Sequence, residues 1–336
     1  MIPYFGEWPV WMPFFLESCK SQEGYEWLLL GDKELTAESP QNVNFLRMGL
    51  DDVHQRIIDC GLPSPEVLIP YKLCDYKPAY GMIFSDLLEG ANFWGHTDID
   101  LAYGCLSNLA NEEFLKDIDV FSADDRSCGH FQIFRNEERM NRLFLNVPNI
   151  DSCLSLTYYV GIDESGMSIA LHQEDNLRWR RASSRKVELT KKQPWMGATI
   201  EPGGQIIDQK IDSVESYLWN DGHAFQILAN GERREFLYLH WFQWKNHTEK
   251  WESLMGSKEW KDKNVHFTLK EWAIHRSKTK ILIKTFIYKA VYRSLYWLSP
   301  LQKSTFHNLK VFDKARAIAQ RNLLIKKESE ASTINR

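Results

Sequence analysis

The sequence lacks an apolar run long enough to cross a membrane. None of its 336 residues falls in a run of the ~18 apolar residues that a membrane-spanning helix needs. The N-terminal stretch MIPYFGEWPVWMPFF has no basic segment and carries Glu7, so it does not resemble a secretory signal. Together these two absences predict a protein that stays in the cytoplasm and is not inserted in the bilayer.

Paired cysteines, internal repeats and low-complexity tracts are also missing. The six cysteines are scattered without a CxxC pair, and without an export signal we expect reduced, mostly buried thiols. Hydrophobic residues make up 43% and charged residues 26% of the chain, which are ordinary values for a globular protein. This composition excludes a disordered chain, a collagen and a coiled coil.

Charge is distributed unevenly along the chain. Residues 1–274 contain 27 basic and 42 acidic residues, whereas residues 275–336 contain 14 and 3, giving net charges of −15 and +11. We therefore predict an acidic globular domain over 1–274 and a basic helical extension over 275–336. Segments 276–298 and 310–323 combine apolar and basic residues as helices on anionic membrane surfaces do. Packing of these helices on the acidic domain is the alternative, and no nucleic-acid partner is expected because the rest of the chain is acidic.

Apolar runs alternate with helical periodicity in the first half of the chain, which predicts an α/β fold with helices on both faces of a sheet. A helix expected over 73–88 should bend at Pro78. Turn sequences predict a series of hairpins over 214–241. Other helices are expected at 11–19, 49–60 and 137–144, and strands at 2–5, 27–30, 43–46, 93–96, 120–122, 130–134, 154–160 and 236–240.

The sequence GHTDID places Asp98 and Asp100 directly after a predicted strand. In extended backbone the side chains of residues i and i+2 point to the same face, so the two carboxylates should lie together. Two ionised carboxylates repel each other unless a cation lies between them, and Mg²⁺ or Mn²⁺ prefers such ligands beside a substrate phosphate. A solvated turn is the alternative interpretation of this short pattern.

Two other enzyme classes share parts of this pattern. A nucleotidyltransferase needs a Gly-Ser pair about a dozen residues upstream, where this chain has IFSDLLEG, and a DxDxT phosphatase needs a Thr that is absent after Asp100. A binding scaffold without catalysis is the non-enzyme alternative, which the intact Asp98 and Asp100 argue against.

Four longer stretches carry a family resemblance, which covers roughly residues 1–245. The chain resembles a bacterial family of glycosyltransferases in polysaccharide biosynthesis, which have the GT-A type of nucleotide-sugar-binding fold. This resemblance implies a GT-A-like (Rossmann-like), mixed and mainly parallel sheet with flanking helices. It also implies a hexosyltransferase that uses Mn²⁺ or Mg²⁺, a nucleotide-sugar donor, with a UDP-sugar favoured, and a glycan or lipid-linked acceptor. The four stretches are FGEWPVWMPFFLESC, PYKLCDYKPAYG, FWGHTDIDLAYG and GHFQIFRN.

The resemblance also implies roles for individual residues around the metal. Asp98 and Asp100 match the DxD motif that holds the metal on the donor diphosphate, and His240 matches a third metal ligand, with a core histidine as the alternative. Asp163 and Glu164 match the base that deprotonates the acceptor, although they also fit a simple polar turn.

The nucleotide pocket is implied in the same way. Asp75 would contact base or ribose, and Lys72 or Lys77 would contact phosphate or pair with Asp75, with a local ion pair as the alternative. At the ends of the first two strands, Asp32 and the Tyr4–Gly6 segment would border the same pocket, where Gly6 lets backbone approach a ligand.

Overall fold

The computed structural model describes residues 1–181, 195–196, 214–241 and 247–268, apart from 36, 105, 124 and 125. Across these ranges no helix is long and apolar enough to cross a membrane. The predicted basic extension 275–336 and its two amphipathic helices lie outside the described residues.

The N-terminal part forms a three-stranded parallel sheet in the order β1 (Ile2–Pro3), β2 (Trp27–Gly31) and β3 (Val43–Arg47). Helix α1 (Met12–Lys20) precedes β2, and α2 (Leu50–Asp59) follows β3. Pro13 stands in the first turn of α1, where its missing N–H leaves no bond unmade. These five elements confirm the predicted ones to within about two residues.

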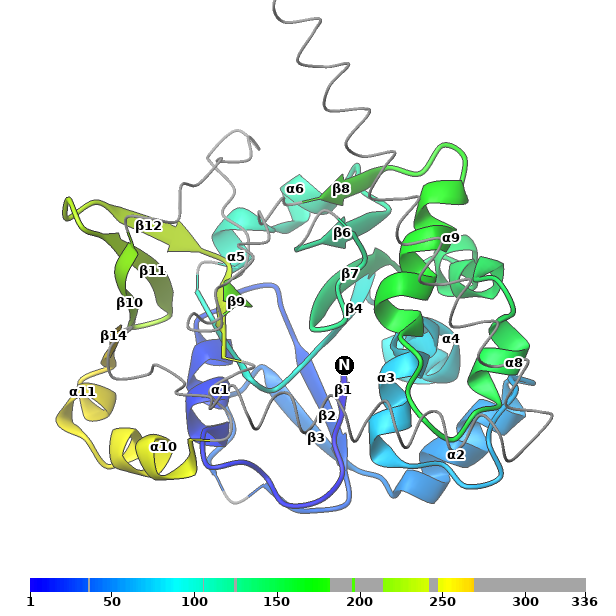
Figure 1. Cartoon of the computed structure of the whole chain (residues 1–336), viewed down its shortest axis with the longest axis horizontal. Coiled ribbons are helices and arrows are strands. Elements are labelled where there is room, and N and C mark those ends of the chain that lie inside the picture. Colours follow the sequence, from blue (N-terminus) through cyan, green and yellow to red (C-terminus); the bar gives the residue numbers. More distant parts are fainter. Residues whose placement is uncertain are drawn as a thin grey trace, which may run out of the picture.

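A second sheet has the order β4 (Phe93–Thr97), β7 (Phe131–Arg135), β6 (Val120–Ser122) and β8 (Trp179–Arg181). In Figure 1 it lies above the N-terminal sheet. The Met1 amino group donates to the Gly95 carbonyl at 2.7 Å, which places β1 beside β4. The two sheets therefore meet edge to edge at the start of the chain.

The stretch predicted as one helix over 73–88 is broken into short pieces. Pro78 stands in the first turn of η2 because it cannot continue the hydrogen bonds of the preceding helix. In chain order the pieces are the 3₁₀ turn η1 (Pro70–Lys72), helix α3 (Leu73–Tyr76), turn η2 (Lys77–Ala79), helix α4 (Tyr80–Ile83) and turn η3 (Ser85–Leu88).

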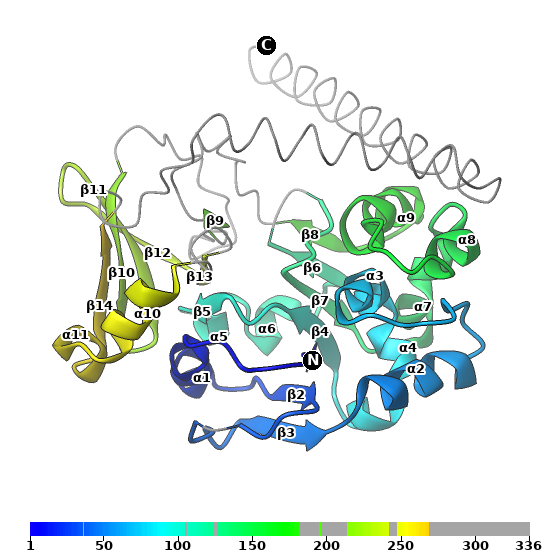
Figure 2. The ribbon, with the colours of Figure 1, turned by 60° about the horizontal axis from the view of Figure 1, so that its bottom comes forward.

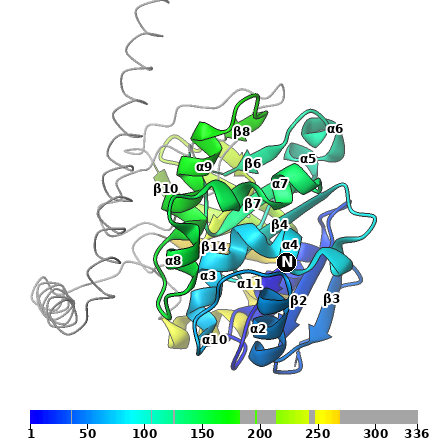
Figure 3. The same ribbon diagram turned by 90° about the vertical axis from the view of Figure 1, so that its right-hand side faces the viewer.

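Further short helices follow in chain order. The helix predicted over 137–144 is split into α7 and η4. Figure 3 shows α2, α3, α4, α8 and α9 gathered on one side of the molecule. The bounds are α5 (Leu106–Leu109), α6 (Glu112–Leu115), α7 (Glu138–Asn141), η4 (Leu143–Asn146), α8 (Ile150–Leu154), the π-helical turn η5 (Ile162–Gly166) and α9 (Met167–Gln173).

The strand predicted over 154–160 is wrong. Helix α8 ends at Leu154, and irregular chain continues to η5. Two buried side chains bind the main chain here: Lys72 donates to the carbonyls of Cys153 and Tyr158, and Asp75 accepts from the N–H groups of residues 160–162. These bonds replace the ladder of a strand.

The C-terminal described part confirms the predicted hairpins. A four-stranded antiparallel sheet has the order β12 (Arg233–Phe236), β11 (His223–Leu228), β10 (Val214–Asn220) and β14 (Asn264–Thr268), with α10 (Thr248–Met255) and α11 (Lys258–Lys261) before β14. Figure 2 shows this sheet at one end of the molecule. It joins α1 through aromatic packing, because Phe14 stacks on Trp241 at 5.4 Å and meets Trp219 edge-on at 4.9 Å.

A small fourth sheet has the order β5 (Leu101–Tyr103), β13 (Tyr238–His240) and β9 (Trp195–Met196). Within the described ranges the molecule is therefore a mixed α/β protein with four small sheets. Seven of the ten strand pairings are antiparallel, so the structure differs from the mainly parallel sheet that we expected. Short connections explain three of the seven, the pairs β6–β7, β10–β11 and β11–β12, because a short loop joins only antiparallel neighbours. The other four antiparallel pairs join strands that are far apart in the chain.

Candidate metal centre

The two aspartates of the DID sequence occupy the short link between β4 and β5. The Asp98 N–H donates to the His130 carbonyl at 3.0 Å, and the Asp100 carbonyl accepts from the Trp241 N–H at 3.0 Å. Main-chain bonds thus fix both ends of the link. Asp100 is 4% exposed, whereas the Asp98 side chain is 37% exposed.

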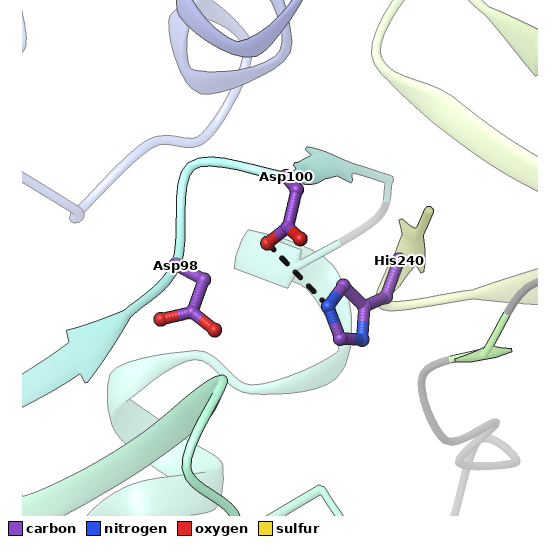
Figure 4. Close-up of side chains that lie close together, drawn as sticks. All are labelled: Asp98, Asp100 and His240. Carbon is purple, nitrogen blue, oxygen red and sulfur yellow. Dashed lines mark ion pairs between the residues drawn. The ribbon is translucent and has the colours of Figure 1, made fainter. Parts of the chain in front are cut away.

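Strand register brings His240 to this link from more than 130 residues further along the chain. In the antiparallel pair β13–β5, His240 lies opposite Leu101, the residue after Asp100. His240 Nε2 lies 3.4 Å from Asp100 Oδ1 (Figure 4). One ligand atom from each of Asp98, Asp100 and His240 falls within 4.8 Å of the others, so the three predicted metal ligands lie together.

The three residues fit a divalent cation. Two carboxylates and an imidazole supply the oxygen and nitrogen donors that Mn²⁺ accepts, and Mg²⁺ favours the carboxylates. Opposite ligands of such an ion stand about 4.2 Å apart, twice a bond of ~2.1 Å. The observed limit of 4.8 Å is close to this span, so small side-chain movements would complete the site.

Lys77 supplies a positive charge at the edge of the centre. Its Nζ lies 2.5 Å from Asp98 Oδ1 and donates to the Gly129 carbonyl at 2.7 Å. Burial alone would lower the pKa of Lys77, but the charges of Asp98, Cys74 and Asp163 raise it well above its usual value. Lys77 is therefore a protonated ammonium that neutralises one of the two aspartates.

A second histidine backs the centre. The His130 ring stacks on the His240 ring with centroids 4.3 Å apart and an interplanar angle of 18°. Its Nε2 lies 2.7 Å from the Tyr238 hydroxyl, and its Nδ1 lies 3.1 Å from the Cys128 sulfur. These contacts hold the His240 ring in place.

Asp163 lies behind Lys77, in η5. It is 3% exposed, accepts a hydrogen bond from the Tyr159 hydroxyl at 2.9 Å, and packs so closely on Gly129 that a Cβ there would lie 2.4 Å from its Oδ2. Burial raises the pKa of Asp163 to about 8, against the opposing charge of Lys77. The neighbouring Glu164 is half-buried.

Lys72 and Asp75 form a separate buried pair, with Nζ and Oδ2 2.9 Å apart and both side chains 0% exposed. Asp75 Oδ1 accepts from the N–H groups of Gly161 and Ile162, and Oδ2 from that of Val160. All these partners belong to the chain itself. The pair therefore holds the 153–162 segment, while its contact with a nucleotide stays a prediction.

The predicted residues of the first two strands also lie together. The Gly6 N–H donates to Asp32 Oδ1 at 2.8 Å, and Gly6 has φ +102°, which a side chain would strain. Tyr4 stacks on Trp8 with centroids 5.0 Å apart. Burial and the charge of Asp100 raise the pKa of Tyr4, and its hydroxyl donates to the Glu7 carbonyl at 3.2 Å.

Three tyrosines beside the site were not singled out from the sequence. Tyr238 has a detectable signature, because it precedes His240 by two residues on one strand and so shares its face. Tyr71 and Tyr159 carry no such pattern, since only the fold brings their rings together at 5.2 Å.

The fold and the site define a mixed α/β protein with a candidate divalent-metal centre. By sequence, the chain belongs to a family described as "Family of unknown function (DUF6625)", whose model matches residues 1–269. Neither a search of curated proteins nor a search of solved structures found a match.

Proposed function

We propose that this protein is a metal-dependent glycosyltransferase. It transfers a sugar from a nucleotide-sugar donor, with a UDP-sugar favoured, to a glycan or lipid-linked acceptor in surface polysaccharide biosynthesis. One observation carries the proposal: His240, which is far in sequence from Asp98 and Asp100, converges with them so that the three ligand atoms lie within 4.8 Å. The sequence resemblance to GT-A glycosyltransferases supports the same assignment.

The centre suits a donor whose leaving group is a diphosphate. Bound Mn²⁺ or Mg²⁺ would neutralise the negative charge that develops on that group. Asp98, Asp100 and His240 would hold the ion. Lys77 lies beside Asp98 and adds a positive charge for a phosphate oxygen. Tyr4, Gly6 and Asp32 would border the nucleotide.

Asp163 and Glu164 are the candidates for the base that accepts the proton of the acceptor hydroxyl. Asp163 is almost fully buried and has a pKa of about 8. The protonated and the ionised forms of its carboxyl group therefore coexist near neutral pH, as a general base requires. Glu164 is more accessible, and the variants below separate the two.

We also propose that the enzyme lies at the cytoplasmic membrane surface. The motivation is the net charge of +11 over residues 275–336, interleaved with apolar residues at helical spacing. A lipid-linked acceptor would be reached from such a position.

The direct test is calorimetric titration with Mn²⁺, followed by hydrolysis of UDP-, GDP- and CMP-sugars with and without the metal. We expect Mn²⁺ to bind, and one nucleotide class to be hydrolysed only when the metal is present. Asp98→Asn and Asp100→Asn should abolish both binding and turnover, whereas Asp86→Asn, at an exposed aspartate on a surface ion pair, should change neither. Near-normal turnover in either DID variant would refute the proposal.

A further inference from the structure

Tyr71 is exposed in a way that the rest of the fold does not explain. It stands in η1 and is 64% exposed, the highest value among the large apolar side chains of the described residues. Most aromatic residues here pack instead in the cores around Phe14, Tyr103 and Tyr80. A single exposed apolar residue needs no explanation, so its surroundings decide whether it matters.

The ring of Tyr71 is held in place. It meets the ring of Tyr159 edge-on, at a centroid distance of 5.2 Å and an angle of 63°. The Tyr159 hydroxyl in turn donates to Asp163. The segment that carries Tyr159 is fixed by the buried Lys72–Asp75 pair. An aromatic surface that is already ordered loses little conformational entropy when a ligand binds.

Tyr71 also lies beside the candidate catalytic groups. Burial of its inner side raises its pKa, and the charges of Cys74, Asp163 and Asp98 raise it further, while Lys77 lowers it. The contacts place the ring near the base candidate Asp163, because its partner Tyr159 donates to that carboxylate at 2.9 Å. The exposed ring thus stands on the Asp163 side of the centre.

An exposed aromatic face next to carboxylates matches a neutral sugar. The C–H groups of a pyranose pack on the ring, and its hydroxyls donate to carboxylates. A nucleobase also stacks, but its diphosphate would then approach Asp163 and Glu164, with no metal between them. We propose that Tyr71, supported by Tyr159, binds the terminal pyranose ring of the acceptor; this rests on the proposed glycosyltransferase function.

Saturation-transfer NMR on the full chain tests the proposal, with the methyl glycosides of glucose, galactose, mannose and N-acetylglucosamine as probes. At least one glycoside should receive saturation through its C–H protons. Tyr71→Phe should keep that binding, and Tyr71→Ala should weaken it by about fivefold, the equivalent of one aromatic contact. Val67→Ala is the matched control, because Val67 is 63% exposed and four residues away.

Hydrolysis of the sugar nucleotide with Mn²⁺ and no acceptor, measured on the same variants, separates this proposal from the proposed function. Tyr71→Ala should hydrolyse the donor at the wild-type rate. No glycoside binding by the wild-type chain, or unchanged binding in Tyr71→Ala, would overturn the acceptor site alone. Loss of UDP binding in Tyr71→Ala would assign the Tyr71 ring to the nucleobase of the donor. A loss of glycoside binding in Val67→Ala equal to that in Tyr71→Ala would indicate a general apolar surface. Either result overturns the proposal.

Discussion

The Lys77 ammonium lies 2.5 Å from Oδ1 of Asp98, so a lysine already neutralises one of the two carboxylates that we propose as metal ligands. The second aspartate is treated differently, since Asp100 is buried and faces His240. The positive charge of Lys77 thereby reduces the repulsion between the two neighbouring carboxylates, and Lys77 must share Asp98 with any metal ion that binds.

Lys77→Met should therefore strengthen Mn²⁺ binding. Two positive charges about 4 Å apart repel by about 4 kcal/mol at an effective dielectric constant of ~20, so removal of one should tighten binding by at least about tenfold. Isothermal titration calorimetry measures this. Lys116→Met removes the same charge from an exposed pair with Glu113 and should leave the affinity unchanged. Weaker binding in Lys77→Met would contradict the competition.

The rate of sugar transfer should rise with pH if Asp163 is the base. Its pKa of about 8 means that the active carboxylate form grows between about pH 7 and 9. The pH profile of kcat/KM reports this midpoint. Asp163→Asn should abolish transfer, whereas Glu164→Gln should keep the profile. A midpoint near 4 would exclude Asp163, and an unchanged rate in both variants would exclude the pair.

The same shift predicts how stability depends on pH. The folded-state pKa of Asp163 lies above its ordinary value of 3.8. The contribution of this shift to the free energy of unfolding is therefore fully present below about pH 4 and is lost as the pH rises towards 8. Asp163→Asn removes this dependence. Urea unfolding gives the free energy of unfolding at pH 5 and pH 8.5. Between these two pH values the wild type should lose more than about 1 kcal/mol relative to the Asp163→Asn variant. Parallel curves would indicate an ordinary carboxyl.

Lys72→Met should destabilise the fold strongly. It leaves Asp75 as an unpaired charge with no exposed surface, which typically costs about 3–5 kcal/mol. Chemical denaturation measures the loss, and the double variant Lys72→Met/Asp75→Asn should recover part of it. Lys116→Met should leave the midpoint unchanged because its pair with Glu113 is exposed. A small effect of Lys72→Met would mean that the pair does not fix the 153–162 segment.

The full chain should sediment with anionic vesicles at low salt and not with zwitterionic ones. Each lysine near such a surface contributes about 1 kcal/mol, so replacement of Lys278, Lys280, Lys284 and Lys289 by Gln should release most of the protein. Salt at 1 M should do the same by screening. Equal sedimentation of the variant would favour packing of the extension on the acidic domain.

The sequence determined most local elements and placed two candidate metal ligands close together in the chain. Short apolar runs such as WLLL and FWGH predicted strands because they are too short for a typical helix and are bounded by turn residues. The i, i+2 spacing of Asp98 and Asp100 placed two carboxylates on one short link. Pro78 predicted a bend in the helix expected over 73–88, because proline has no backbone N–H to donate to the preceding turn.

Tertiary structure decided how these pieces pair and what their charged groups contact. Residues 154–160 look like a strand by composition, yet Lys72 and Asp75 take their main-chain groups. Lys72 and Lys77 lie in the same short stretch on either side of Asp75, and the sequence does not show which of them pairs with it. In the structure Lys72 binds Asp75 and Lys77 binds Asp98. His240 reaches Asp100 only through the register of β13 on β5. Such choices depend on contacts between residues far apart in the chain, whose energies local spacing does not encode.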